Sequence, residues 1–333
     1  MKSITIAITL GDPGGIGPEV TVKAIREIKK TSLGKNIFFV LVGSLSVPEH
    51  FNKKLRANLK FTQLNARDFN RQDFESGRIA VCDPDAGKKV NFSIGEISSR
   101  NGHLALKAID LGVDICLKGL ADALVTAPVN KAAIQKVLPS FDGHTDYLKS
   151  RAGAKRVAMM FIAGKLKMSL VTMHLPLKRV SHELSKKKII EKIELTYETL
   201  KHLFSIKHPR IGVSALNPHG GEFGIEEKSI IAPAVRQCKR RISNLAGPIP
   251  GDEIFRELWE GKWDAVVAMY HDQGLAPFKM IAFYNGVNLT VGLPFIRTSP
   301  DHGTAFDIAY QNKADHRPML AAIELAIKLS SKK

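Results

Sequence analysis

Short apolar, β-branched runs alternate along this chain with longer segments of helical periodicity. Residues 37–43 (IFFVLVG) are apolar at consecutive positions, which is typical of a strand buried on both faces of a mainly parallel sheet. Such an alternation predicts an α/β fold with helices on both sides of the sheet. The same periodicities predict strands at 3–10, 37–43, 122–126, 157–162, 168–173, 210–216, 263–269 and 287–292, and helices at 18–30, 99–118, 185–204, 225–241, 302–311 and 316–331.

The strong positive charge of the chain raises the question of a nucleic-acid partner. A net charge of +17 is spread over short clusters, such as 186–188 and 239–241, that fall on predicted helices. The sequence shows no basic stripe interleaved with aromatic residues, so we expect no nucleic-acid partner and a basic field that attracts anionic small molecules. The alternative, a basic nucleic-acid-binding protein, predicts salt-sensitive binding to DNA or RNA.

The composition is typical of a globular protein. Hydrophobic residues make up 44% and charged residues 24% of the 333 residues, enough for a sizeable core. No apolar stretch approaches the roughly 20 residues of a membrane helix, and the N-terminal residues predict a strand rather than a signal peptide. We therefore expect a cytoplasmic protein without a membrane partner. Cys82, Cys116 and Cys238 are far apart in the sequence and are expected to be reduced packing residues.

A glycine-rich segment, GDPGGIGPE at residues 11–19, follows the first predicted strand. It matches neither G-x-G-x-x-G nor G-x-x-x-x-G-K-[ST], the two common phosphate-binding templates. Pro18 and Glu19 are typical of the first turn of a helix, where proline loses no hydrogen bond and an acid faces the positive end of the helix dipole. Taken alone, the segment is interpreted as a tight strand-to-helix turn.

Three histidines, His174, His219 and His271, each follow a predicted buried strand directly. In an open α/β sheet, ligands bind beyond the carboxyl ends of the strands. Neutral imidazoles at that edge suit Zn²⁺ or a similar divalent ion and leave a coordination position for substrate. The alternative is that each ring forms only structural hydrogen bonds. The pattern favours a metal site, with Asp272 as a further ligand or as the residue that orients one.

Other polar segments are candidates for a binding site. GHTD at 143–146 is either part of such a site or a helix start capped by Thr145. Lys279 and Arg297 suit a phosphate or carboxylate, the alternative being ordinary surface charges. SPDHGTA at 299–305 leads into a predicted helix, and it either offers backbone amides to a nucleotide or simply starts that helix.

With these groups assembled, the chain resembles the 4-hydroxythreonine-4-phosphate dehydrogenase family of the vitamin B6 pathway. The motifs that carry the resemblance span nearly the whole chain and are, in order, ITLGDPGGIGPEV, DALVTAPVNKAAI, FDGHTDYL, VTMHLPL, LNPHGGE, GPIPGD, DAVVAMYHDQGLAPFK and VGLPFIRTSPDHGTAFDIA. The family is similar in fold to isocitrate and isopropylmalate dehydrogenases, which implies a two-lobed α/β/α molecule with a mainly parallel central sheet. The lobes expected from it are a cofactor-side lobe of residues 1–135 plus 280–333 and a metal and dimerisation lobe of residues 136–279.

The resemblance also assigns roles to individual residues. It implies that the metal ligands, drawn from both chains of a homodimer, are His174, His219 and His271. It implies that the substrate-binding residues are His144, Thr145, Lys279, Asn288 and Arg297. The stretch 301–307 matches a segment near the NAD adenosine, which implies cofactor contacts by Gly303, Thr304 and Asp307. Asp252 and Asp272 match acidic positions close to the metal, and we expect Asp252 or Lys279 to take the substrate proton.

In related dehydrogenases the counterpart of the glycine-rich segment lies near the nicotinamide. The resemblance therefore changes the interpretation of this segment. Instead of a simple turn, it is expected to be a boundary of the site where glycines let cofactor and substrate approach the backbone closely. Its shape-setting residues are expected to be Gly11, Asp12 and Gly14.

Three segments depart from the family pattern. The segment after Glu222 is shorter than in the family, which shifts the loop beside His219. Residues 310–312 (YQN) stand where the family pattern begins with glycine, and they bear on the choice between NAD and NADP. Asp146 occupies a position where glutamate is common.

The family's reaction is the NAD-dependent oxidation of 4-phosphooxy-L-threonine, followed by loss of CO₂ to give 3-amino-2-oxopropyl phosphate. For this chain the resemblance implies NAD, with NADP as the alternative, and one divalent ion per site, Zn²⁺, Mg²⁺ or Co²⁺. One alternative substrate is a related four-carbon sugar acid, D-threonate or D-erythronate 4-phosphate. A different alternative, a phosphate acyltransferase, shares the wider fold but uses neither NAD nor metal, and the three histidines argue against it.

Overall fold

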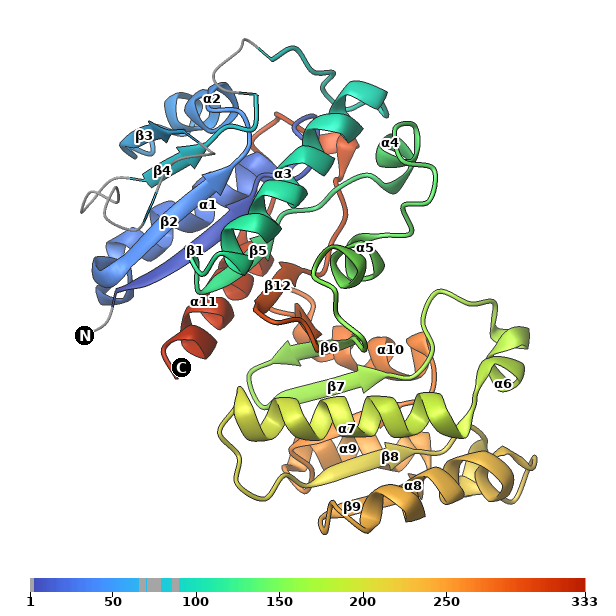
Figure 1. Ribbon diagram of the computed structural model, residues 1–333. Coiled ribbons are helices and arrows are strands. Elements are labelled where there is room, and N and C mark those ends of the chain that lie inside the picture. The colour runs from blue at the N-terminus through green and yellow to red at the C-terminus, as the bar shows by residue number, and fades with distance from the viewer. Residues whose placement is uncertain (1–2, 66–69, 71–78, 86–89, 333) are drawn as a thin grey trace. The chain divides into compact units, whose positions relative to one another are not determined.

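Two compact units make up the chain in the computed structural model, which describes residues 3–65, 70, 79–85 and 90–332 (Figure 1). Unit 1 is formed by residues 1–154 and 293–331 and unit 2 by residues 155–292, with the last two residues divided between them. The predicted lobes divide the chain after residue 135 and before residue 280. The units divide later because α5 (His144–Arg151) packs Leu148 into the core of unit 1, and β11 (Val287–Val291) pairs with β6 (Ala158–Ala163) of unit 2.

The sheet of unit 1 is parallel throughout, with the strand order β3-β4-β2-β1-β5-β12. Its strands are β1 (Ile4–Thr9), β2 (Ile37–Val42), β3 (Phe61–Leu64), β4 (Ile79–Cys82), β5 (Ala123–Thr126) and β12 (Ile296–Pro300). Nearly every residue of β1 and β2 is buried, which explains why these runs are apolar at consecutive positions. All six strands end at the same edge, where ligands bind in folds of this type.

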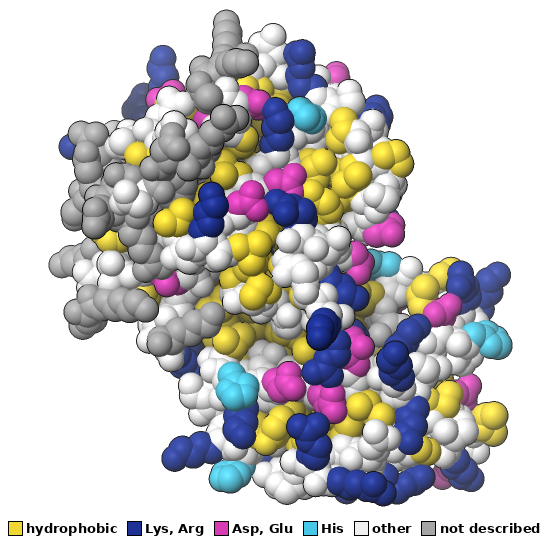
Figure 2. All heavy atoms as spheres, in the orientation of Figure 1, with side chains coloured by type: hydrophobic (Ala, Val, Ile, Leu, Met, Phe, Trp, Pro, Cys, Tyr) yellow, Lys and Arg dark blue, Asp and Glu magenta, His cyan; other side chains and the backbone are white. Residues whose placement is uncertain are grey.

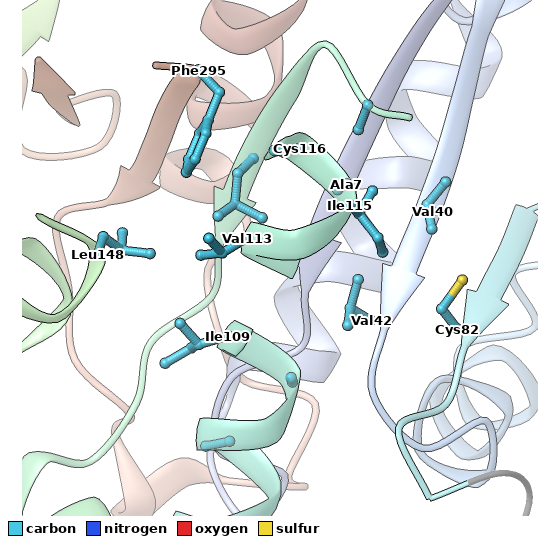
Figure 3. Packing of buried hydrophobic residues seen from close by; sticks show 14 of the residues in the cluster. Ala7, Val40, Val42, Cys82, Ile109, Val113, Ile115, Cys116, Leu148 and Phe295 are labelled. Carbon is cyan, nitrogen blue, oxygen red and sulfur yellow. The ribbon is translucent and has the colours of Figure 1, made fainter. Parts of the chain in front are cut away.

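Helices cover both faces of this sheet, with α3 on one face and α1 on the other (Figure 1). The helices of unit 1 are α1 (Gly17–Lys30), α2 (Ser46–Lys54), α3 (Ser99–Leu117), α4 (Lys131–Gln135), α5 (His144–Arg151) and α11 (Arg317–Ser330), with short 3₁₀ turns at η1 (Ser32–Asn36) and η6 (Phe306–Ile308). Figure 3 shows Ile109 and Val113 of α3 within the core cluster, together with Val42 of β2. The core therefore lies between α3 and the strands that precede it.

The sheet of unit 2 is mixed, with the strand order β11-β6-β7-β10-β8-β9. Strand β6 runs antiparallel to β11 and β7, whereas β7, β10, β8 and β9 are parallel to one another. The strands not yet defined are β7 (Leu166–Leu170), β8 (Ile211–Ser214), β9 (Leu245–Ile249) and β10 (Ala265–Ala268). The helices and turns are η3 (Leu177–Arg179), α6 (Val180–Glu183), α7 (Lys186–His202), η4 (Pro218–Gly220), the π-helical η5 (Glu227–Ile231), α8 (Ala232–Lys239), α9 (Gly251–Glu260) and α10 (His271–Ala282). Helices α7 and α8 pack on one face, and α9 and α10 on the other.

The mainly parallel α/β architecture predicted from the sequence is confirmed, and each predicted strand is present. The helix predicted at 302–311 is wrong, because only the turn η6 forms there. Ala305, Tyr310 and Asn312 have φ angles of 40°, 61° and 62°, which no right-handed helix accommodates. Strands β3, β4, β9 and β12 and helices α2, α4, α5, α6, α9 and α10 were not predicted.

The described helices, the visible surface and the cysteines bear on the partners and the redox state expected from the sequence. Within the described residues, every helix is too short or too polar to cross a membrane. Figure 2 shows Lys and Arg side chains interspersed with Asp and Glu on the visible face. Cys82, Cys116 and Cys238 are buried and free, as predicted.

Candidate functional site

The three predicted metal ligands follow three neighbouring parallel strands of unit 2. His174 lies after β7, His271 after β10 and His219 after β8, and the strand order here is β7-β10-β8. Because adjacent parallel strands end at the same edge of a sheet, all three histidines lie beyond one edge. The topology thus places them as the sequence predicted.

Two of these histidines are side by side. The ring centroids of His174 and His271 are 5.7 Å apart. His271 is the first residue of α10, and its Nδ1 lies 2.7 Å from Oδ1 of Asp272. This hydrogen bond engages Nδ1, and carboxylates orient metal-binding imidazoles through the same kind of contact. Asp272 therefore fits the orienting role better than that of a direct ligand.

His219 lies in a different local structure from this pair. It lies in η4 with φ 56° and ψ 15°, a left-handed conformation that is uncommon for a residue with a side chain. Its ring faces that of Phe223, with 5.9 Å between centroids. Among the described residues of this single chain, no group of three or more His, Cys, Asp or Glu side chains converges to hold a metal. The donor chemistry of the His174–His271 pair suits a divalent ion, but one chain assembles only part of the predicted ligand set.

Residues that the sequence did not single out tie the three strand ends together. Gln273 accepts a hydrogen bond from the Met269 amide and donates one to the Ala215 carbonyl, each at 2.7 Å, which joins β10 to β8. Thr172 donates from Oγ1 to the Met269 carbonyl at 2.8 Å, which joins β7 to β10. The only sequence signal for Gln273 was its place directly after the His271–Asp272 pair.

The loop that carries His219 is held by a buried acid. Oε1 of Glu227 accepts hydrogen bonds from the amides of Leu216 and Asn217, each at 2.8 Å. Burial alone would raise the pKa of Glu227, but the hydrogen bonds from Asn217 and the backbone outweigh it and lower the pKa. Glu227 therefore stays ionised at neutral pH and continues to accept these hydrogen bonds from the loop.

Unit 1 carries a buried cation at the carboxyl edge of its own sheet. Arg297 of β12 is 2% exposed, and its Nε and Nη2 both donate to Oγ1 of Thr126, at 3.1 and 2.5 Å. Burial lowers the pKa of Arg297, yet a guanidinium remains charged at neutral pH. A buried positive charge at a ligand-binding edge is suited to a phosphate or a carboxylate.

His144, the first residue of α5, lies within the electrostatic reach of Arg297. Burial, and then the positive charge of Arg297, hold the pKa of His144 well below its usual range, so the imidazole is neutral. Its Nε2 is inaccessible to solvent and has no hydrogen-bond partner among the described residues. Gly143 rather than Thr145 is the N-cap of α5, and Thr145 is buried. An unpartnered buried nitrogen beside a cation is a feature of a ligand site rather than of a helix cap.

The other predicted substrate and catalytic residues belong to unit 2. Asn288 of β11 donates from Nδ2 to Sδ of Met159 at 3.1 Å, while its buried Oδ1 has no partner among the described residues. Lys279 is half-buried in the last turn of α10. Asp252 is exposed in the first turn of α9, and within the described residues no hydrogen bond or ion pair joins it to a histidine. The structure therefore brings Asp252 into contact with none of the predicted ligands.

The predicted cofactor residues lie in the loop after β12, directly against the glycine-rich segment. A Cβ on Gly303 would meet open space, and Asp307 is exposed. Thr304 is buried, and its carbonyl accepts a hydrogen bond from the amide of Ile16 at 3.0 Å. The loop therefore combines open backbone with a rigid support, which fits a bound cofactor.

Asp12 of the glycine-rich segment is fully buried. Its Oδ1 accepts hydrogen bonds from the Gly14 amide at 2.9 Å and from Asn101 Nδ2 at 3.0 Å. Its Oδ2 has no partner among the described residues. Burial raises the pKa of Asp12 to about 6, although both hydrogen bonds act in the opposite direction. A Cβ on Gly14 would lie 2.1 Å from the Ser93 carbonyl oxygen, so this position admits only glycine.

Comparisons with known proteins agree along the whole chain. Residues 36–326 match the family described as pyridoxal phosphate biosynthetic protein PdxA. The 4-hydroxythreonine-4-phosphate dehydrogenase of Desulforapulum autotrophicum is 41% identical, covering 96% of this chain and 94% of that protein. The D-threonate 4-phosphate dehydrogenase of Salmonella typhimurium is 37% identical, covering 99% of this chain and 100% of that protein.

Solved structures extend this similarity to the fold. The crystal structure of a 4-hydroxythreonine-4-phosphate dehydrogenase from Klebsiella pneumoniae has a TM-score of 0.84 at 36% identity and covers 98% of each chain. A terephthalate 1,2-cis-dihydrodiol dehydrogenase from Burkholderia xenovorans has a TM-score of 0.67 at 26% identity, again with 98% of each chain covered.

Proposed function

Because the chain belongs to the family of pyridoxal phosphate biosynthetic proteins PdxA, we propose that it oxidises 4-phosphooxy-L-threonine to 2-amino-3-oxo-4-phosphooxybutanoate with NAD as hydride acceptor. Its relatives are dehydrogenases, so the chain is an oxidoreductase that acts on a CH–OH group with a nicotinamide cofactor. In the proposed reaction, the carbon that bears the 3-hydroxyl gives up a hydride, and the hydroxyl gives up a proton. The β-keto acid then releases CO₂ and takes up a proton to give 3-amino-2-oxopropyl phosphate.

The observation that carries this proposal is buried Arg297 in unit 1 together with the half-buried His144, whose Nε2 is inaccessible to solvent. Arg297 supplies a fixed positive charge, and the neutral His144 has a nitrogen without a partner among the described residues. A phosphate or carboxylate of the substrate would balance the charge of Arg297 and accept a hydrogen bond from Nε2 of His144. The remaining proposed substrate contacts come from Thr145, Asn288 and Lys279. Held at several points, the substrate would present its C3–H bond in one orientation.

We propose that His174, His219 and His271 hold a divalent ion, Zn²⁺, Mg²⁺ or Co²⁺. When bound, such an ion lowers the pKa of a hydroxyl that it contacts and stabilises negative charge on oxygen. Asp272 orients His271 for this role through the 2.7 Å hydrogen bond. Lys279 or Asp252 is the proposed acceptor of the hydroxyl proton.

We further propose a homodimer that completes this metal site. Met280, Phe283 and Tyr284, at the end of α10, are 84%, 68% and 53% exposed, and such clusters of large apolar side chains mark interfaces. The same helix begins with His271. A second copy that covers this surface would therefore lie on the helix that supplies a ligand.

The cytoplasmic location and the preference for NAD over NADP stay predictions from the sequence.

The reaction is tested by NADH formation from 4-phosphooxy-L-threonine, before and after treatment with a chelator. We expect turnover that the chelator abolishes and that one of the three ions restores. Turnover that the chelator leaves unchanged would contradict the metal proposal. Failure to reduce NAD or NADP with any of the ions would overturn the dehydrogenase reaction with this substrate.

D-threonate 4-phosphate is the second candidate substrate, because the Salmonella typhimurium relative aligns over its full length with this chain. It also carries a phosphate and a carboxylate, so the Arg297–His144 pair does not separate the two substrates. Turnover of both, together with D-erythronate 4-phosphate, is compared in parallel by kcat/KM. A higher kcat/KM for either sugar acid would assign the chain to that substrate.

The base is assigned by comparing Lys279→Met with Asp252→Asn. Loss of the base lowers kcat and kcat/KM together by about 100-fold or more. If both variants turn over at the rate of the wild type and differ only in KM, neither residue is the base.

A further inference from the structure

The loop of residues 302–314, which follows β12, is unusually strained for its length. Ala305, Tyr310 and Asn312 have positive φ angles of 40°, 61° and 62° although none is glycine. Such a conformation is unfavourable for a residue with a side chain and persists only when its surroundings impose it. The contacts that hold it come from the glycine-rich segment, residues 11–19, from the helix that it starts, and from aromatic residues outside both.

The first contact fixes the beginning of the loop. The amide of Ile16 donates to the Thr304 carbonyl at 3.0 Å. A Cβ on Gly15 would lie 3.0 Å from both Cβ and the carbonyl oxygen of Thr304, which is tighter than ordinary van der Waals contact. Glycine at position 15 therefore allows two backbone segments to meet directly.

The second contact fixes the middle of the loop through Tyr310. Its hydroxyl donates to the Pro13 carbonyl at 2.8 Å. Its ring packs between Phe51 and Phe92, with centroid distances of 4.7 and 6.0 Å, and His50 lies 5.3 Å away. The side chain of Tyr310 thus joins its own strained backbone position to Pro13 of the glycine-rich segment.

The third contact fixes the end of the loop through a buried ion pair. Glu19 Oε1 accepts hydrogen bonds from the Ala314 amide at 3.1 Å and from Lys23 Nζ at 2.7 Å. Lys23 also donates to the Ala314 carbonyl at 3.0 Å. Glu19 is 0% and Lys23 is 9% exposed. Removing one partner of such a buried pair leaves an uncompensated charge, so the arrangement is sensitive to single changes.

We infer that the glycine-rich segment is an anchor that holds loop 302–314 in its strained form, with Tyr310 and Glu19 as positioning residues for the nicotinamide cofactor. The inference rests on the proposed function, together with the cofactor contacts that the resemblance implies for Gly303, Thr304 and Asp307 of this loop. It gives the GDPGGIGPE motif a role that needs no phosphate-binding template. It also accounts for Tyr310 in place of the family's glycine, because the side chain's contacts offset the strain of a positive φ.

The test uses Tyr310→Phe, which removes only the hydroxyl, and Glu19→Gln, which removes only the charge. Tyr197→Phe in α7 is the matched control, because its hydroxyl has no hydrogen bond among the described residues. Hydrogen exchange of residues 302–314 is measured by mass spectrometry, and KM for NAD and for the phosphorylated substrate by steady-state kinetics. We expect exchange in the loop and KM for NAD to rise about 3- to 10-fold in Tyr310→Phe and further in Glu19→Gln. The control and KM for the phosphorylated substrate should change less than 2-fold.

Unchanged exchange of residues 302–314 in Tyr310→Phe would overturn the anchor. Faster exchange with an unchanged KM for NAD would overturn the role in positioning the cofactor. If Glu19→Gln does not fold, Tyr310→Phe alone decides between these outcomes. A wild-type enzyme that reduces neither NAD nor NADP would instead overturn the proposed function, and with it the cofactor role, whereas the exchange data would still test the anchor.

Discussion

A single buried carboxyl, Asp12, makes the stability of unit 1 depend on pH. Burial raises its pKa from 3.8 to about 6, so the folded chain binds this proton more tightly than the unfolded chain does. The stability that Asp12 contributes is therefore complete below pH 3.8 and is lost as the pH rises through about 6. The titratable side chain that faces it is Tyr310, whose own pKa is raised by burial and then by the charge of Asp12.

We expect Asp12→Asn to be more stable than the wild type above pH 6, by roughly 1–3 kcal/mol, with no difference below pH 4. Asparagine keeps an acceptor for the Gly14 amide and for Asn101 and removes the buried charge. The measurement is the free energy of unfolding in urea at pH 4, 6 and 8, with the exposed Asp146→Asn as control. A variant that is less stable than the wild type at pH 8 would show that the ionised carboxylate is needed in the fold.

Arg297 is the residue for which a lysine is not an adequate replacement. Both of its bonds to Thr126 use the planar guanidinium, and a lysine ammonium cannot reproduce this fork. We expect Arg297→Lys to lower kcat/KM about 100-fold or more, chiefly through KM for the phosphorylated substrate, because the charge moves away from the anion. Arg317→Lys, in an exposed ion pair with Asp315, is the control. Steady-state kinetics that show an equal KM for both variants would remove Arg297 from the substrate site.

At the scale of elements, the contact of α3 with α4 depends on one glycine. A Cβ on Gly102 would lie 2.1 Å from the Ala133 carbonyl oxygen, a backbone atom that moves only if α4 moves. We expect Gly102→Ala to lower the free energy of unfolding by about 2 kcal/mol or more, despite the better helix propensity of alanine. Arg100→Ala, exposed in the same helical turn, should change it by less than about 0.5 kcal/mol. Equal urea midpoints for the two variants would mean that α4 shifts without cost.

Elements were predictable where periodicity was strong and local. Helices α1, α3, α7 and α11 carry apolar residues at helical spacing and were found nearly to their ends. Helix α10 was not predicted because it contains Pro277 and is apolar on more than one side. The predicted helix at 302–311 failed because contacts far away in the sequence, to Pro13, Ile16 and Glu19, impose positive φ angles there.

At the scale of the whole molecule, the exposed end of α10 is one apolar surface that a single chain leaves uncovered. We expect Phe283→Asp to convert the proposed homodimer to a monomer, measured by sedimentation, because a carboxylate cannot be buried there without a partner. Bound metal per chain, measured by elemental analysis, should fall with it. Leu33→Asp, at a 42% exposed position of unit 1, is the control and should stay dimeric. A wild-type chain that sediments as a monomer would contradict the interface.

The sequence by itself determined the α/β class, the parallel strands and the residues that gather beyond their ends. It could do so because the predicted strands are largely apolar, and because polar turns follow them in the chain. The three histidines were singled out in this way, whereas Arg297 was singled out as a charge in an apolar stretch.

Only the tertiary structure decided what these residues do to one another. It showed that the rings of His174 and His271 are neighbours and that Asp272 contacts Nδ1 of His271. The sequence placed Glu19 only in the first turn of a helix. The structure showed that its carboxylate also accepts a hydrogen bond from Ala314, nearly the whole chain away. Pairings of this kind depend on which strands lie side by side and on burial, which turns an ordinary carboxyl into a buried charge. Local sequence patterns reveal neither the neighbours of a strand nor the burial of a side chain, because both arise only when distant segments pack.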